Sequence, residues 1–271
     1  MGKIVTIQGF DVYYERSGHP ELPVLVCLHG FTGSTATWKE VSAQLQEHAQ
    51  VIAVDLIGHG RTVCPTAVKE YTMEKQIALL EAFFDHLQIP SFTLLGYSMG
   101  GRIALSYALA YPERVNQLIL ESASPGLKTE KERAERRLND EALASRIERE
   151  GMERFVEFWE NIPLFQSQKR LPEPVQRQVR MERQSQRPIG LANSLRGIGT
   201  GSQPSNWEKL STLLMPVLLI TGGWDEKFVL ISREMRKHIQ HVEHQVVKQA
   251  GHAIHVENPS LFATIVKKHI I

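Results

Sequence analysis

Cysteine is scarce in this chain of 271 residues, which contains only Cys27 and Cys64. One lies in an apolar run and the other in a loop-like stretch, so neither a disulfide framework nor a cysteine-rich zinc site is indicated. No apolar run approaches the roughly 20 residues that a membrane-spanning helix needs. The opening stretch MGKIVTIQGF also lacks the apolar segment and small-residue cleavage site of a secretory signal. We therefore expect a cytoplasmic protein.

An excess of charge of either sign is also missing. The chain has 31 lysines and arginines against 30 acidic residues, a formal net charge of +1. No overall field favours nucleic acid or a membrane surface as a partner. The histidine pair in HAIH lacks the acidic or cysteine partners of a metal site. We expect no metal, no cofactor and no nucleic acid or membrane partner, and a monomer or a small homo-oligomer.

Apolar runs that alternate with helical patterns predict the fold class. A strand pair is predicted over 3–18, and buried strands over 23–30, 51–60, 91–98, 115–122, 215–225 and 244–252. Helical spacing occupies 37–48, 73–88, 99–113, the region around 231–240, and 259–270. This alternation predicts an α/β protein with a mostly parallel sheet that helices cover on both faces.

The alternation stops between about Gly126 and about Trp207. This segment has no apolar strand run, and its first half is charged and helix-prone. The sequence therefore predicts an α/β core formed by 1–122 and 208–271, with a helical cap inserted over 123–207.

Ser98 stands in a motif that is typical of a nucleophile. GYSMG fits the pattern G-x-S-x-G, with the apolar strand LLGY before it and the helical stretch MGGRIALSYAL after it. A sharp strand-to-helix turn would hold the hydroxyl at the N-terminus of a helix, whose dipole stabilises negative charge. The alternative is an exposed serine in an ordinary tight turn.

A hydroxyl of this kind needs a histidine to accept its proton and a carboxylate to orient that histidine. In this type of fold the chain order is serine, acid, histidine. Asp225 follows the strand VLLITGGW and His252 follows VVKQAG, so both have the expected order. His255 is the nearest competitor of His252, and Glu226 and Asp55 are the other strand-end carboxylates. Asp55 comes too early in the chain.

An anionic intermediate needs backbone N–H donors close to the serine. One donor is expected from Met99, directly after the serine, and the other from Phe31 in the glycine-bounded loop HGFTG. We expect His29 and His59 to brace these loops rather than to act as acid or base.

Arg102 lies four residues after Ser98, so the two residues share one helix face. The plain alternative is a salt-bridged helix residue. The cap adds about a dozen arginines, and the arginine fork is the preferred partner of carboxylates. Inward-facing arginines would form a pocket for a multiply anionic substrate. Trp159 and Phe165 would form its apolar wall, unless they are simply cap core.

The motifs HGFTG, DLIGHG, GYSMGG, GGWD and AGH, in this order, resemble the α/β-hydrolase superfamily over essentially the whole chain. This resemblance implies an α/β-hydrolase fold with an eight-stranded sheet, a catalytic triad and an oxyanion hole. GYSMGGR, AERRLND, FWENIPLF, ERQSQ, SLRGIGTGSQPSNW and AGHAIHVENP resemble the 2-succinyl-6-hydroxy-2,4-cyclohexadiene-1-carboxylate synthase family of menaquinone biosynthesis. That family is a lyase. It eliminates pyruvate from 2-succinyl-5-enolpyruvyl-6-hydroxy-3-cyclohexene-1-carboxylate, and it consumes no water.

The resemblance also implies residue roles. Ser98, Asp225 and His252 match the triad, which acts as a general base in this lyase, and the amides of Phe31 and Met99 match the oxyanion hole. The substrate carries three carboxylates, which explains several arginines. The positions that match substrate-contacting side chains are Tyr97, Arg102, Arg136, Trp159 and Arg183. Because Arg137 is adjacent to Arg136, either arginine fits its position.

Two other classes of function remain open. A serine hydrolase, either an esterase or a carbon–carbon bond hydrolase for acidic ring-cleavage products, would use the same triad and form an acyl adduct or activate water. Pyruvate release without an acyl adduct separates the lyase from it. A non-enzymatic receptor or scaffold on this fold usually loses part of the triad, and all three triad candidates are present here.

Overall fold

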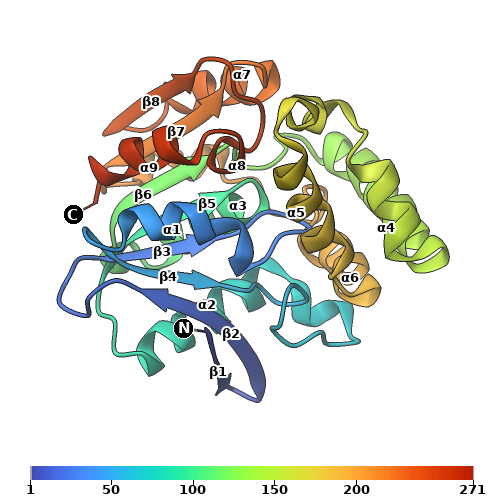
Figure 1. Ribbon diagram of the computed structural model, residues 1–271, viewed down its shortest axis with the longest axis horizontal. Helices are drawn as coiled ribbons and strands as arrows, with labels where there is room; N and C mark the ends of the chain where they lie inside the picture. Colours follow the sequence, from blue (N-terminus) through green and yellow to red (C-terminus); the bar gives the residue numbers. More distant parts are fainter. Residues whose placement is uncertain (1, 271) are drawn as a thin grey trace.

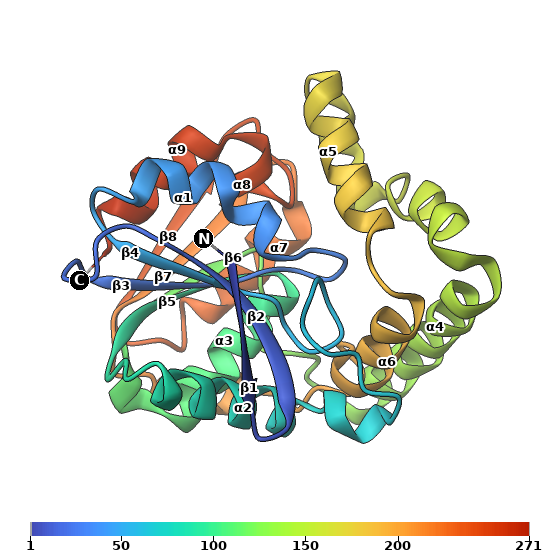
Figure 2. The ribbon, with the colours of Figure 1, turned by 60° about the horizontal axis from the view of Figure 1, so that its bottom comes forward.

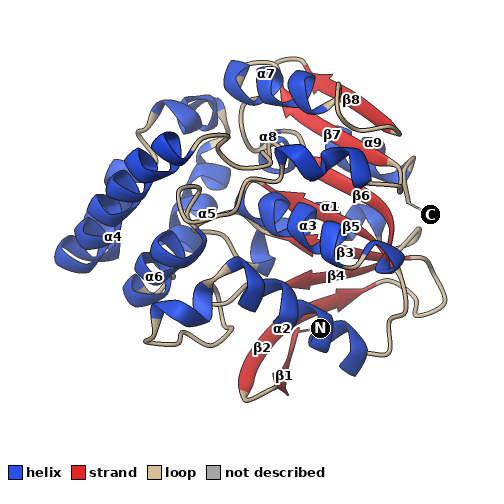
Figure 3. Ribbon diagram, turned by 180° about the vertical axis from the view of Figure 1, so that it is seen from behind, coloured by secondary structure: helices blue, strands red, loops and turns tan. Residues whose placement is uncertain are grey.

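A single eight-stranded sheet organises the chain, in a computed structural model that describes residues 2–270. Its spatial order is β1-β2-β4-β3-β5-β6-β7-β8. The strands are β1 Gly2–Ile7, β2 Phe10–Ser17, β3 Val24–Leu28, β4 Gln50–Val54, β5 Phe92–Tyr97, β6 Val115–Glu121, β7 Val217–Gly222 and β8 Val242–Val247. Only the β1–β2 and β2–β4 pairings are antiparallel (Figure 3). This confirms the predicted mostly parallel sheet.

Helices cover both faces of this sheet, as the alternation predicted (Figure 2). The core helices are α1 Lys39–Leu45, α2 Met73–His86, α3 Met99–Ala110, α7 Glu226–Met235, α8 Ile254–Glu257 and α9 Pro259–Lys267, with 3₁₀ turns η1 Thr35–Trp38, η2 Val68–Tyr71, η3 Pro112–Arg114 and η5 Trp207–Thr212. Trp38 and Phe262 pack on one face beside α1 and α9. Phe83 and Tyr107 pack on the other face, which α2, α3 and α7 cover. Central strands are therefore apolar on both sides, which explains their unbroken apolar runs.

The helix after β7 differs from its prediction. We predicted it around 231–240, whereas α7 occupies Glu226–Met235. Asp225 occupies the N-cap position, and its side chain accepts a hydrogen bond from the Phe228 N–H at 3.5 Å. This cap favours an earlier helix start than apolar spacing alone predicts.

The inserted segment forms a group of helices beside the sheet (Figure 1). Its elements are α4 Glu130–Trp159, the 3₁₀ segment η4 Pro163–Arg170, α5 Glu173–Gln184 and α6 Pro188–Ile198. Thr129 and Glu132 form a reciprocal capping box at the start of α4. Gly151 has a φ of 74°, so α4 is broken there into two helical halves. A small apolar core, centred on Ile147, Phe155 and Leu191, joins α4 to α6.

The two ends of this cap meet in space. The carbonyl of Pro125 accepts a hydrogen bond from the Asn206 N–H at 2.7 Å, and the carbonyl of Gly126 accepts one from the Trp207 indole at 2.9 Å. On this basis we propose the division into a core of 1–122 and 208–271 and a cap of 123–207. None of the helices within residues 2–270 has both the length and the apolar character that a bilayer crossing needs.

Candidate active site

Ser98 occupies a strained turn between β5 and α3. Its φ of 50° and ψ of −106° lie outside the regions that side-chain-bearing residues favour. The turn is held because the Ser98 N–H donates to the Glu121 carbonyl at 2.8 Å, while the first turn of α3 packs against the end of β3. A Cβ at Gly100 would collide with the carbonyl of Leu28, which explains the glycine in GYSMGG. The hydroxyl is thus presented at the start of α3 in a fixed position.

The structure brings together the serine, histidine and aspartate that the sequence singled out. The Oγ of Ser98 lies 3.0 Å from Nε2 of His252, and Nδ1 of His252 lies 2.6 Å from Oδ2 of Asp225. His252 and Asp225 are 2% and 8% exposed, so this chain of contacts is shielded from water. With Nδ1–H donating to the carboxylate, Nε2 is free to accept the serine proton. The geometry therefore suits a hydroxyl that gives up or passes on a proton.

Aromatic rings surround the His252 imidazole. The rings of Phe228, Tyr97 and Phe165 have centroids 4.7, 5.3 and 6.2 Å from that of the imidazole. They come from α7, from the end of β5 and from the cap segment η4. The cap therefore contributes directly to the walls around the histidine.

The loop after β3 lies against the serine. A Cβ placed on Gly30 would be 3.6 Å from the Ser98 Cβ, and both Phe31 and Met99 line the cavity in front of Ser98. Neither the Phe31 N–H nor the Met99 N–H donates to a group within the described residues. Two free backbone donors beside a reactive hydroxyl are what an oxyanion needs.

Two buried histidines lie beneath this loop. His29 donates through Nδ1 to the Gly30 carbonyl at 2.8 Å and accepts through Nε2 from the Leu56 N–H at 3.0 Å. Its ring lies 5.1 Å from that of His59. Burial lowers the pKa of His29 to about 3 and that of His59 to about 4, so both are neutral. Neither lines the Ser98 cavity, in keeping with a bracing role.

Two competing candidates, Asp55 and His255, are occupied elsewhere, and the third, Glu226, is exposed and does not line the cavity in front of Ser98. Asp55 accepts hydrogen bonds from the backbone N–H groups of Thr35 and Arg61, and burial raises its pKa to about 6. His255 lies between two partners. Its Nδ1 faces the Glu121 carboxylate at 2.8 Å, and its Nε2 faces the Thr37 hydroxyl at 2.8 Å. His255 and Glu121 are fully buried, and neither lines the cavity. Glu121 was missed in the sequence, although a carboxylate inside the apolar strand VNQLILES was a visible signal.

A cavity of about 350 Å³ opens in front of Ser98. One side is apolar, with contributions from Phe31, Trp159 and Phe165. The charged side chains that line the cavity, His252 aside, are the cations Arg102, Lys128, Arg136 and Lys227 and the carboxylate Glu132. Such a surplus of positive charge selects an anionic ligand with an apolar portion. Lys128 and Lys227 were not singled out in the sequence. Lys128 faces the cavity through the packing of the cap, and Lys227 lies in the first turn of α7, ahead of the helix that the sequence predicted.

Arg102 is the most deeply buried of these cations, with 9% of its surface exposed. One of its terminal nitrogens donates to the Ile198 carbonyl and to Oε1 of Gln203, both at 2.6 Å. Among the described residues, no carboxylate forms an ion pair with it. Burial lowers the pKa of this guanidinium to about 10, which leaves it charged at neutral pH. A buried cation with unused donors is a marker of a ligand site.

The cap residues differ in how they face this cavity. Arg136 lines it and is held from behind by Asp140, whose Oδ1 lies 2.7 Å from the arginine Nε. Arg137 does not line it and instead pairs with Glu130. Trp159 lines the cavity, and its buried indole N–H has no hydrogen-bond partner among the described residues. Tyr97 lines it as well, and burial raises the pKa of its phenol well above its usual range.

Arg183 is not among the residues that line the cavity in front of Ser98. Its guanidinium lies over the Phe165 ring, 4.4 Å from the centroid, and donates to Oε1 of Gln168 at 2.9 Å. Arg183 instead lines the larger cap cavity and a small cavity that also borders Phe31 and Tyr97. The expected contact between Arg183 and a substrate stays a prediction.

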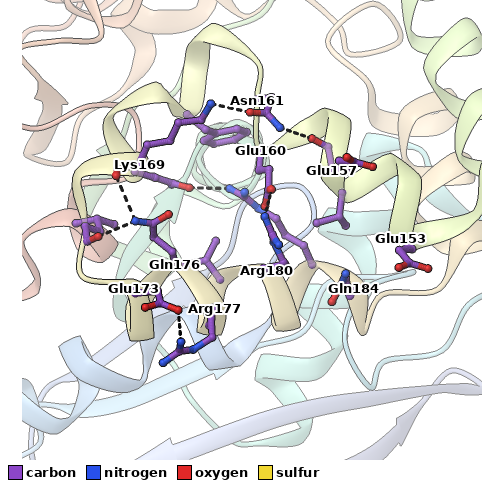
Figure 4. Close-up of a pocket in the computed structure, with 16 residues that line it drawn as sticks. Glu153, Glu157, Glu160, Asn161, Lys169, Glu173, Gln176, Arg177, Arg180 and Gln184 are labelled. Atoms are coloured by element: carbon purple, nitrogen blue, oxygen red, sulfur yellow. Dashed lines mark hydrogen bonds and ion pairs between the residues drawn. The ribbon is translucent and has the colours of Figure 1, made fainter.

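A larger cavity of about 760 Å³ lies in the cap, between the second half of α4, η4 and α5 (Figure 4). Several of its charged groups already have partners within the groove. Arg180 pairs with Glu160, Arg177 pairs with Glu173, and Lys169 donates to Asn161. Ser98 and His252 do not line it. We therefore assign the chemistry to the smaller cavity, where the triad lies. Residues 2–270 contain no cluster of three or more histidine, cysteine or acidic side chains able to hold a metal ion.

Comparisons with known proteins agree with this geometry. The family model described as the alpha/beta hydrolase fold matches residues 23–259. A Bacillus subtilis (strain 168) protein that carries the name 2-succinyl-6-hydroxy-2,4-cyclohexadiene-1-carboxylate synthase provisionally is 48% identical over 246 residues, 91% of this chain and 89% of its own. The synthase of the same name from Salmonella agona (strain SL483) is 33% identical over 243 residues, 90% of this chain and 92% of its own. A solved structure of MenH from S. aureus superimposes with a TM-score of 0.88 at 39% identity, covering 93% and 96% of the two chains.

Proposed function

Since this chain belongs to the 2-succinyl-6-hydroxy-2,4-cyclohexadiene-1-carboxylate synthase family of α/β hydrolases, we propose that it is the lyase its relatives are named for. It eliminates pyruvate from 2-succinyl-5-enolpyruvyl-6-hydroxy-3-cyclohexene-1-carboxylate. The product is the cyclohexadiene of the family name. This places the protein in menaquinone biosynthesis.

The bonds that change follow from the two compound names. The hydrogen on ring carbon 2 is acidic because that carbon lies next to the succinyl ketone and to the ring double bond. Removal of this hydrogen as a proton shifts electrons along carbons 2 to 5. The double bond between carbons 3 and 4 is thereby replaced by double bonds between carbons 2 and 3 and between carbons 4 and 5. The bond from carbon 5 to oxygen breaks, and the enolate of pyruvate leaves. That enolate takes up a proton at its methylene carbon to give pyruvate, so no water is consumed.

We propose that Ser98 is the base for this proton. His252 lies 3.0 Å from the hydroxyl, and Asp225 stabilises the imidazolium that forms as the serine proton moves to Nε2. The proton of carbon 2 passes to the serine oxygen, and His252 returns a proton to the departing enolate. The negative charge gathers on the ketone oxygen, where the Phe31 and Met99 amides are its donors.

The carboxylates of the substrate account for the cations of the cavity. Arg102 and Arg136 are the proposed partners of two substrate carboxylates, and Trp159 and Tyr97 are proposed to border the cyclohexene ring of the substrate. The observation that carries the proposal is Arg102, a buried guanidinium beside the serine turn that forms no direct ion pair with any carboxylate of the described residues. A hydrolase of neutral esters has no use for that charge, because it only adds a desolvation cost.

The test is release of pyruvate from the enolpyruvyl substrate. Lactate dehydrogenase and NADH report pyruvate, while a new absorbance band reports the conjugated diene. Deuterium at ring carbon 2 is expected to slow the reaction, because the base breaks that bond. Mass spectrometry of the protein during turnover is expected to show no acyl adduct on Ser98.

The alternative is a serine hydrolase for an acidic substrate. Its supporting observation is the intact Ser98–His252–Asp225 geometry, which a hydrolase also requires. Rapid turnover of simple aryl esters without any pyruvate release would replace the lyase proposal with this one.

A further inference from the structure

One carboxylate joins the cap to the loop that carries His252. Glu257 is the last residue of α8, and its Oε2 accepts a hydrogen bond from the Gly251 N–H at 2.7 Å. Its Oε1 accepts a second one from the Ser167 hydroxyl at 2.9 Å. Gly251 directly precedes His252, whereas Ser167 belongs to the cap segment η4. The two oxygens of one side chain thus hold the histidine loop and the cap at the same time.

The cap lies directly on this loop. A Cβ at Gly251 would collide with the Ser167 side chain, so the glycine of AGH is required by the close approach of η4. Within residues 2–270, the Ser167–Glu257 contact is the single hydrogen bond between cap residues 123–207 and the segment 248–257, which contains the His252 loop and α8. Burial raises the pKa of the Glu257 carboxyl despite its hydrogen bonds. A partly desolvated carboxylate makes the loss of one bond more costly than it would be in water.

The same segment holds the wall of the substrate cavity. Phe165, two residues before Ser167, packs edge-on against His252 at 6.2 Å and against Trp159 at 5.7 Å. Gln168, one residue after Ser167, accepts the hydrogen bond from Arg183. A shift of η4 would therefore move Phe165 relative to the base and would change the distance between Arg183 and the cavity.

We propose that Glu257 is a positioning residue. It holds η4, and with it the Phe165 side chain that lines the cavity, in a fixed position relative to His252. It touches neither the substrate nor the reacting atoms. This inference rests on the proposed function for its substrate, but its geometry concerns the cap and the histidine loop alone. Loss of the Ser167–Glu257 hydrogen bond alone loosens Phe165 and leaves the triad intact. Loss of the Glu257 carboxylate disturbs both Phe165 and the triad.

The Ser167→Ala variant removes the hydrogen bond from η4 to Glu257 and keeps the bond from the Gly251 N–H. We expect its KM for the enolpyruvyl substrate to rise roughly three- to tenfold, with kcat within about twofold of the unchanged protein. The matched control is Ser145→Ala, which removes a cap serine whose hydroxyl donates to Glu141 within α4. The control is expected to leave both constants unchanged. Circular dichroism and melting temperature verify that both variants fold.

A second assay measures the reactivity of Ser98 in the triad without the enolpyruvyl substrate. Diisopropyl fluorophosphate phosphorylates an activated serine and releases fluoride, and it is small enough to need no cap. We expect Ser167→Ala to react at the rate of the unchanged protein and Glu257→Ala to react more slowly, with a raised KM as well. Glu257→Gln keeps one acceptor for the Gly251 N–H and an amide for Ser167, so it is expected to rescue both readouts.

The outcomes separate the two proposals. Absence of pyruvate release from the unchanged protein refutes the proposed lyase. With pyruvate release intact, an unchanged KM in Ser167→Ala overturns the positioning role, as do equal losses in Glu257→Gln and Glu257→Ala.

Discussion

Replacing Arg102 by methionine tests the assignment of the cavity most directly. The change keeps a long unbranched side chain but removes the guanidinium of Arg102, a residue that is 9% exposed and forms no ion pair with a carboxylate among the described residues. Truncating one partner of a buried, hydrogen-bonded charge pair typically costs about 2–5 kcal/mol. The cavity opens to solvent, and the other cations that line it also attract the substrate carboxylates. We therefore take the lower part of that range, about 2–4 kcal/mol. This corresponds to a loss of roughly 30- to 900-fold in kcat/KM.

The assay is pyruvate release at several substrate concentrations, with kcat and KM separated. Arg196→Met is the matched control, because Arg196 pairs with Glu141 and Glu148 on the cap surface and does not line the cavity. We expect that control to stay within about twofold of the unchanged protein. If Arg102→Met retains kcat/KM within threefold while it melts normally, Arg102 is a structural residue that serves Ile198 and Gln203, and the anionic-substrate argument fails.

Three further changes test the remaining features. Ser98→Ala should abolish nearly all pyruvate release while the melting temperature holds, because the hydroxyl is the proposed base; substantial residual turnover would move the base to His252 itself. Arg136→Met should raise KM for the tri-acid, whereas Arg137→Met, adjacent but paired with Glu130, should not, and equal effects would contradict the assignment. Lowering the pH should reduce the free energy of unfolding, because His29 and His59 have folded pKa values near 3 and 4, below the unfolded value of about 6.5. Their contribution is complete above about pH 6.5 and is lost as the pH falls toward 4, by about 2 kcal/mol for each histidine at pH 5. Urea unfolding at pH 7 and pH 5 measures this, with His59→Gln expected to lessen the slope and exposed His19→Gln to leave it unchanged.

The strands and the mostly parallel sheet could be predicted because each buried strand is an apolar run that ends in glycine or a turn. The spatial order of the strands was not predicted. The chain order of Ser98, Asp225 and His252 likewise follows from strand ends, since parallel strands place their carboxyl ends at one edge. The start of α7 could not be predicted from apolar spacing, because its first turn carries Glu226 and Lys227. A cap interaction of Asp225 with the backbone of its own helix set that boundary instead.

The cap side chains were predicted less completely, for a physical reason. Arg136 and Arg137 are neighbours in sequence, and only the packing of α4 on α6 decides which one faces the cavity. Arg183 packs on Phe165 and donates to Gln168, both in η4, a tertiary arrangement that local pattern does not encode. Glu121 and Glu257 are likewise defined by partners more than 80 residues away, His255 and Ser167.

The contact between the two ends of the cap has an evolutionary consequence. Because residues 125–126 hydrogen-bond to residues 206–207, the intervening chain leaves and re-enters the core at nearly one point. A segment whose ends already touch can lengthen, shorten or be exchanged without stretching the frame around it. The proton-transfer residues all lie outside that segment, while Arg136 and Trp159 lie inside it. Lineages built on this frame can therefore acquire new substrates by rewriting one exchangeable module, with the inherited base left in place.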